Sequence, residues 1–94
     1  MKARLKIEVD EATREREQLI RKAISDLIRT ERQRQPTTLT QEKLANLAEI
    51  SFEHLNHIEN YKSTASVEVL DRIARALGFH RVSEFLANDQ HNIL

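Results

Sequence analysis

Residues 39–60 carry two short amphipathic segments separated by a tight turn, and this feature constrains the fold more than any other. Each segment follows a residue that caps helices well, Thr40 before the first and Ser51 before the second. Ala45 stands where the two helices would cross, and its small side chain lets their backbones approach closely. The apolar faces consist of Leu44, Leu47 and Ala48 in the first segment and Leu55 and Ile58 in the second. Two short helices joined this tightly predict a helix-turn-helix unit.

The composition indicates a small and mostly helical domain. The chain has 94 residues, of which one is Gly and one is Pro. The lack of cysteine excludes disulfides and cysteine-ligated zinc. No apolar run approaches the length of a membrane span, and the N-terminus has no signal-peptide core. We therefore expect a soluble, cytoplasmic protein that does not bind membranes.

Charge is balanced over the chain but unevenly distributed along it. The 15 Lys and Arg residues equal the 15 Asp and Glu residues in number. Residues 1–35 carry ten basic and seven acidic residues, residues 36–62 carry two and four, and residues 63–94 carry three and four. Since DNA binding without sequence preference depends on neutralising phosphates, we expect modest DNA affinity that depends on dimer formation.

The N-terminal third predicts one long helix over residues 11–35. Asp10 is a good N-cap, and Gln35 is pushed out of helical geometry by Pro36. The helix would have about 24 residues and span about 36 Å, which is long for a small domain. Its first half is therefore expected to extend beyond the core and pack on a second subunit. Its apolar stripe consists of Leu19, Ile20, Ala23, Ile24, Leu27 and Ile28.

Residues 1–10 form an arm before this helix. Residues 4–9 alternate polar and apolar side chains, which is typical of a β-strand. A lone strand must pair, and pairing with its two-fold copy in a homodimer is one interpretation. A frayed arm is the other.

Two more helices follow a polar loop. Ser66 is the expected cap of the first, and Gly78 suits the left-handed position that closes it. The second is short, over about residues 81–87, and residues 88–94 form a tail without a clear signal. The apolar positions are Val67, Leu70, Ile73, Ala74 and Leu77, then Val82, Phe85 and Leu86. The predicted fold is all-α with five helices, the last four forming a helix-turn-helix domain over residues 36–87.

A specific combination of residues runs through positions 39–86. It consists of Leu39-Thr40-Gln41-Glu42, Leu44-Ala45, Ser51, Leu55, Ile58-Glu59-Asn60, Lys62, Leu70, Ile73-Ala74, Ala76-Leu77-Gly78 and Phe85-Leu86. This pattern resembles the phage-repressor helix-turn-helix family, the Cro/repressor or XRE type. In that family the second helix lies across the DNA backbone and the third enters the major groove.

The resemblance implies a function and an assembly. Its members are usually homodimeric transcription regulators that read palindromic operators in double-stranded DNA, without a cofactor. We therefore expect a sequence-specific DNA-binding repressor that dimerises through residues 4–9 and the first helix. Two residues depart from the family pattern: Glu49 replaces the usual Gly in the turn, and Tyr61 replaces the Gly that usually follows Glu-Asn.

The outer face of the third helix follows from its periodicity. At 100° per residue, the side opposite its apolar stripe carries Glu53, His57 and Asn60, with Phe52 and Asn56 on the flanks. The resemblance implies base contacts by Phe52, Glu53 and His57, and Asn56 is added as a flanking candidate. Glu53 could accept from cytosine, His57 could donate to guanine, and Phe52 could touch a thymine methyl. The alternatives are a solvated Glu53 that phosphates repel and a Phe52 packed against the second helix.

Phosphate contacts are expected at helix starts and in the loop after the third helix. Helix N-termini favour anions because of their unpaired N–H groups and positive dipole ends. For Thr40 simple capping is the alternative, and both roles can coexist. The resemblance also implies that Glu59 forms a structural ion pair with an Arg of the first helix, for which Arg32 is the candidate. The expected phosphate-binding residues are Thr40 and Ser51 at the helix starts, together with those that the resemblance implies: Gln41, Asn60, Lys62 and Ser63.

The sequence gives little support to metal binding or catalysis. His54 and His57 are three residues apart, but no third metal ligand is clearly placed, so two surface histidines are expected and no metal. The chain has no Gly-rich phosphate loop and no recognisable nucleophile, and we expect no enzymatic activity.

The rival function is a protein-interaction module, such as an antitoxin or anti-repressor. There the arm and long helix would contact a partner such as a toxin, with DNA binding secondary.

Overall fold

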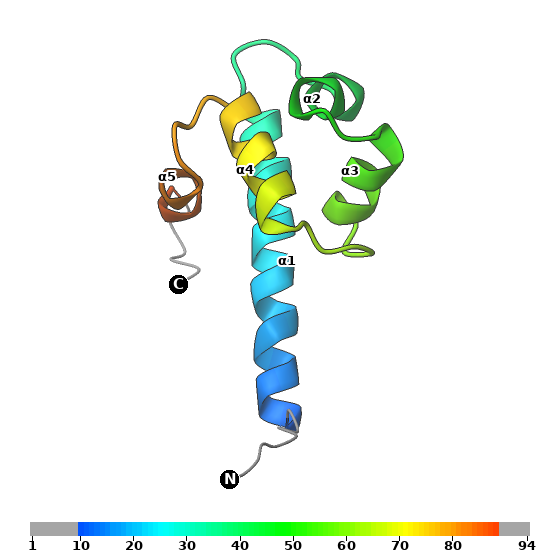
Figure 1. Ribbon diagram of the computed structural model, residues 1–94, viewed down its shortest axis with the longest axis vertical. Helices are drawn as coiled ribbons and strands as arrows, with labels where there is room; N and C mark the ends of the chain where they lie inside the picture. The colour runs from blue at the N-terminus through cyan, green and yellow to red at the C-terminus, as the bar shows by residue number, and fades with distance from the viewer. Residues whose placement is uncertain (1–9, 89–94) are drawn as a thin grey trace, which may run out of the picture.

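The computed structural model describes residues 10–88 and has five α-helices in that range. A long helix, α1, runs the length of the molecule, with α2 and α3 on one side of its upper half and α5 on the other (Figure 1). The helix bounds are α1 Glu11–Gln33, α2 Gln41–Ala48, α3 Phe52–Glu59, α4 Val67–Ala76 and α5 Val82–Ala87. The predicted five-helix, all-α fold is confirmed, whereas the suggested strand over residues 4–9 and most of the tail lie outside the described residues.

Local capping explains where the helices begin. The side chains of Asp10, Thr40, Ser51 and Ser66 each accept a hydrogen bond from the backbone N–H three residues on. The hydrogen bond from the Thr13 N–H lowers the pKa of the Asp10 carboxyl below its ordinary value. These four starts were predicted from the sequence and are confirmed, because an N-cap depends only on residues within one turn.

The core lies between the C-terminal half of α1 and the other four helices. In α2, α3 and α4, the faces that meet are formed by small and branched aliphatic residues. Phe85 of α5 is fully buried and stacks edge-to-face on Phe79, with ring centroids 5.3 Å apart. The buried apolar residues are Leu27, Ile28, Leu44, Ala45, Ala48, Leu55, Ile58, Leu70, Ile73, Ala74, Leu77 and Phe85.

Three residues placed on apolar stripes, Leu19, Leu47 and Val67, are exposed and lie outside this core. Leu47 of α2 is 62% exposed, because the buried face of that helix centres on Leu44, Ala45 and Ala48. Val67, at the start of α4, is 72% exposed, since it precedes the part of the helix that α2 and α5 cover. A stripe drawn from periodicity alone was therefore too wide in these helices.

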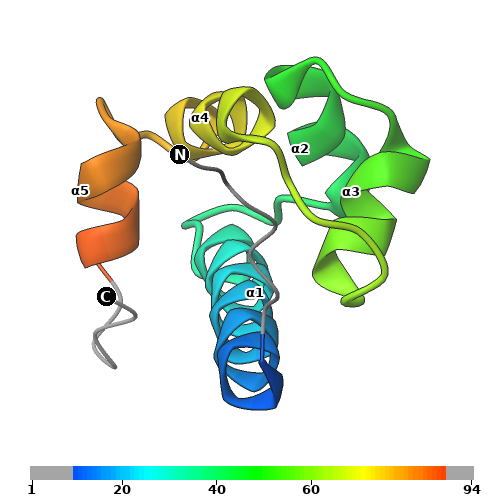
Figure 2. The same ribbon diagram turned by 60° about the horizontal axis from the view of Figure 1, so that its bottom comes forward.

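The N-terminal half of α1 stands clear of the other helices (Figure 2). Residues 11–19 are all exposed, including Leu19 at 68%. By its rise per residue the whole helix is about 34 Å long. No helix within residues 10–88 combines the length and apolar character needed to cross a bilayer.

Candidate nucleic-acid interface

The turn between α2 and α3 is short and left-handed at one residue. Glu49 ends α2 with φ 59° and ψ 43°, and its N–H donates to the carbonyls of Ala45 and Asn46. The N–H of Ile50 then donates to the Ala45 carbonyl at 3.0 Å. This pattern of hydrogen bonds closes the helix and sets the angle at which α3 leaves it. The backbone therefore has at Glu49 the conformation that glycine normally supplies.

The outer face of α3 carries three of the predicted base-reading residues. Phe52 is 52% exposed, Glu53 is exposed, and His57 is half-buried. Leu55, Ile58 and the carboxylate-bearing Glu59 face inward. The exposed face of α3 therefore carries an aromatic ring, a carboxylate and an imidazole. Together these groups can contact methyl groups, donors and acceptors on base edges. Phe52 is not sealed against α2.

Behind that face, a network of half-buried polar side chains surrounds the buried Glu59. Glu59 is 1% exposed and accepts two hydrogen bonds from Arg32 of α1, from Nε at 2.9 Å and from Nη2 at 3.0 Å. Gln41, the first residue of α2, donates to Glu59 Oε1 at 3.0 Å and accepts from the Asn56 amide at 3.0 Å. The structure thus brings together Arg32, Glu59, Gln41 and Asn56 in one network that links α1, α2 and α3.

This network gives Gln41 and Asn56 inward partners that the sequence did not indicate. Both residues were singled out for contacts with DNA, and each uses part of its amide group within the protein. Arg32 also donates to the Leu39 carbonyl at 3.0 Å, which fixes the loop before α2. Any contact of Gln41 with a phosphate starts from a side chain that is already oriented by Glu59.

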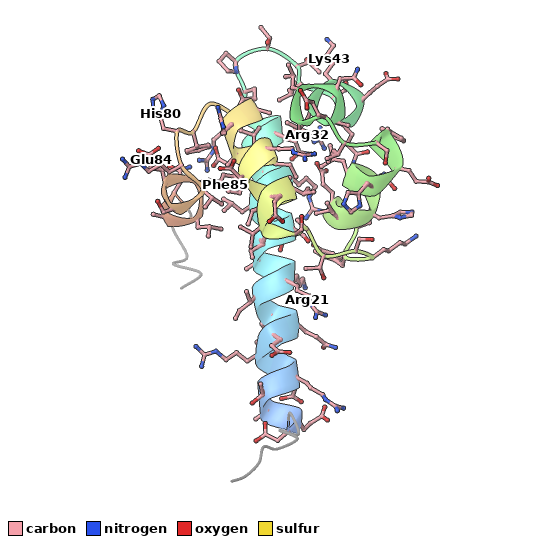
Figure 3. The ribbon with its side chains drawn as sticks, in the orientation of Figure 1. Arg21, Arg32, Lys43, His80, Glu84 and Phe85 are labelled. Carbon is pink, nitrogen blue, oxygen red and sulfur yellow. The ribbon has the colours of Figure 1, made fainter. Side chains whose placement is uncertain are left out.

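Two clusters of possible phosphate-binding groups flank α3. On one side Thr40 accepts from the Lys43 N–H at 3.1 Å, so its hydroxyl caps α2. The first-turn N–H groups of a helix have no partner within the helix and favour an anion. Figure 3 shows the Lys43 side chain beside this end of α2. At the start of α3, Ser51 Oγ accepts from the His54 N–H in the same way. These helix starts can hold an anion without any cationic side chain.

On the other side lies the loop that follows α3. Lys62 and Ser63 both donate their backbone N–H groups to the His57 carbonyl, at 2.8 Å and 3.2 Å. The Asn60 amide donates to the Asn56 carbonyl at 2.8 Å, so this exposed side chain is also held locally. The loop is therefore tied to the end of α3, and Lys62 remains exposed.

Tyr61 is the residue of this region whose role the sequence did not reveal. It adopts φ 65°, and its hydroxyl donates to Asp26 and accepts from Arg29 Nη2 at 3.2 Å. Arg29 also donates to the Glu59 backbone carbonyl at 3.1 Å. The one available signal was its position, because a large aromatic stands where the resembling family has glycine. The contacts with α1 could not be read from that position alone.

Two short helices crossing at a small residue, with an outward polar face on the second and capped helix starts beside it, define a helix-turn-helix DNA-binding protein. The Helix-turn-helix family model matches residues 28–82, more than half of the chain. The chain belongs to this family, in its XRE type, and is a DNA-binding transcription regulator. No curated protein and no solved structure matches the chain.

Proposed function

We propose that the protein is a homodimeric repressor that reads a palindromic operator, with α3 of each subunit in one major groove. The observation that carries this proposal is the outer face of α3, where Phe52 and Glu53 are exposed beside His57. Half-sites read by such a dimer are about 34 Å apart, one turn of DNA. A regulator of this kind acts in the cytoplasm, and it needs neither a cofactor nor enzymatic activity.

Each residue of the interface has a separate role in the proposal. Glu53 accepts from a cytosine amino group, His57 donates to a guanine, and Phe52 touches a thymine methyl. Asn56 contacts a base edge from the position that its hydrogen bond to Gln41 gives it. The phosphates on either side are bound by the starts of α2 and α3 and by the loop after α3, through Thr40, Gln41, Ser51, Asn60, Lys62 and Ser63.

The exposed half of α1 supports the dimer in this proposal. Leu19 is 68% exposed on a helix that extends beyond the core, where a second copy of α1 would cover it. The dimer also compensates for the low basicity of the helix-turn-helix segment, because two readers share one operator.

The test is a selection of binding sequences from random duplexes, followed by gel-shift titration of the selected and a scrambled duplex. At about 50 mM salt we expect both to bind, and at about 200 mM salt we expect the selected duplex alone to remain bound. Absence of binding to any duplex at low salt would contradict the proposal. That result would instead favour the protein-interaction role, in which α1 contacts a partner such as a toxin.

The base-reading role of α3 is tested by Glu53→Gln and His57→Ala. We expect each change to reduce discrimination between selected and scrambled duplexes by about 1–3 kcal/mol, and Glu53→Gln to alter the preferred base at one position per half-site. Glu68→Gln, which removes an exposed acid from the first turn of α4, is the matched control. If Glu53→Gln raises affinity equally for both duplexes, Glu53 acts only by repelling phosphates.

A further inference from the structure

A groove lies between α1 and the loop after α3. It has a volume of about 390 Å³, and its walls come from two consecutive turns of α1 and from the loop. Figure 3 shows Arg21 extending from α1 just below that loop. The cationic and hydroxyl groups that line it are Arg21, Lys22 and Ser25 from α1, with Lys62, Ser63 and Thr64 from the loop.

The electrostatic character of this groove is positive. No carboxylate lines it, whereas three cationic side chains do. Within residues 10–88, none of the ion pairs involves Arg21, Lys22 or Lys62. Asp26, one turn further along α1, is paired with Arg29 at 2.7 Å and also accepts from Tyr61. The charge of these three cations is therefore not cancelled by a bound acid in the described part of the chain.

Tyr61 holds the two walls of the groove together. The Lys22 ammonium lies 5.7 Å from the centre of its ring, and the Arg29 guanidinium carbon lies 5.8 Å from it. The hydrogen bond with the Tyr61 hydroxyl raises the pKa of Arg29 above its ordinary value. The backbone of the loop is fixed at the same time by its hydrogen bonds to the His57 carbonyl. Groups from α1 and from the loop thus face one space in a defined arrangement.

We propose that this groove binds a backbone phosphate of double-stranded DNA, so that α1 extends the DNA interface beyond the helix-turn-helix unit. The inference rests on the proposed function, because it needs α3 in the major groove to bring the loop to the backbone. Lys62 and Ser63 belong to the loop contact already described, and Arg21 and Lys22 are the added contacts. A phosphate oxygen can accept from guanidinium, ammonium and hydroxyl groups together, which are the donors this groove supplies.

The test measures how DNA affinity depends on salt for Arg21→Gln and Lys22→Gln, with Arg75→Gln as control. Arg75 is an exposed cation in the last turn of α4, and its loss removes the same charge away from the groove. Each phosphate contact contributes about −0.9 to the slope of log affinity against log salt. We expect each α1 variant to make the slope less steep by about 0.9 per bound subunit, with the ratio of selected to scrambled affinity unchanged.

A second measurement locates the contact on the DNA. Replacing single backbone phosphates by uncharged methylphosphonates should reveal a position that weakens the unaltered protein but has no further effect on Arg21→Gln. Slopes of both α1 variants equal to that of Arg75→Gln, or the same methylphosphonate effect in every variant, would overturn the inference while the proposed function stands. If the unaltered protein binds no duplex at all, it is the proposed function that fails.

Discussion

Two residues adopt backbone conformations that most side chains avoid, and both lie at the ends of the helix-turn-helix helices. Glu49 has φ 59° and Tyr61 has φ 65°. In this left-handed region, the Cβ atom of a non-glycine residue comes too close to the carbonyl oxygen that follows it. This close approach costs about 1 kcal/mol. Tyr61 has compensating contacts with Asp26, Arg29 and Lys22. Glu49 takes part in hydrogen bonds through its backbone: its N–H donates to Asn46, and its carbonyl accepts from the Arg72 side chain at 3.4 Å.

We therefore expect Glu49→Gly to stabilise the protein. The change keeps every backbone hydrogen bond of the turn and removes the left-handed strain, so the free energy of unfolding should rise by about 1 kcal/mol. Urea unfolding followed by circular dichroism measures it. Glu42→Gly, in the first turn of α2, is the control and should lower the same quantity by about 1 kcal/mol. A loss of stability in Glu49→Gly would mean that its side chain stabilises the turn.

The partners of Glu59 were only partly predictable from the sequence. Arg32 was chosen as the partner of Glu59 because the family pattern implies an Arg in the first helix, and the two form an ion pair in the structure. Gln41 could not be placed in the same network, since its distance from Glu59 depends on how α2 crosses α3. The proposed DNA contacts of the outer face remain predictions.

At the scale of elements, α1 and α3 are joined by a buried charge pair. The side chain of Arg32 is 13% exposed and that of Glu59 is 1% exposed. In the Arg34–Glu31 pair at the end of the same helix, Glu31 is also buried, but Arg34 is 55% exposed and Glu31 keeps a second donor, Asn88. Removing one member of a buried pair leaves an uncompensated charge, whereas an exposed Arg is already solvated.

Arg32→Gln should accordingly lower the free energy of unfolding by about 3 kcal/mol. Arg34→Gln removes the same group from the same helix and should change it by less than about 1 kcal/mol. Chemical denaturation of both variants under one set of conditions makes the comparison. Equal effects of the two substitutions would show that the Arg32–Glu59 pair does not link α1 to α3 energetically.

The positions of the helices were largely predictable, because residues close to each helix end determine where it begins or stops. Four side-chain caps and one glycine at φ 98° mark their ends, and each acts within one turn of the chain. The buried faces were less predictable, as Leu47 and Val67 show. Which flank of an eight- or ten-residue helix is covered depends on its neighbours, and periodicity does not specify those neighbours.

At the scale of the whole molecule, the most unusual feature is the exposed half of α1. An isolated helical segment is marginally stable in water, and residues 11–19 are exposed throughout in the part of the chain that the structure describes. A second copy of the helix would cover Leu19 and stabilise this segment. The proposed homodimer would supply this contact.

Leu19→Glu should weaken dimer formation without unfolding the monomer, because the side chain is largely exposed in one subunit. Sedimentation equilibrium over a range of concentrations is the measurement, and we expect the dimer dissociation constant to increase at least about tenfold, or about 1.4 kcal/mol. Leu47→Glu, which alters an equally exposed leucine of α2, should leave it unchanged. A protein that is monomeric before any substitution would contradict the proposed assembly.

The attachment of α1 to the end of α3 has a mechanical consequence. Glu59 is the last residue of α3. Its carbonyl accepts a hydrogen bond from Arg29 and its carboxylate accepts from Arg32. Within residues 10–88, the opposite end of α1 extends away from the other helices (Figure 1). Because α1 is one continuous helix that is hydrogen-bonded to α3, a movement of its N-terminal end is transmitted to α3. A partner that binds the N-terminal end of α1, about five turns from Arg29, would move α3 together with α1, and would so change the angle at which the proposed DNA-contacting face meets the double helix.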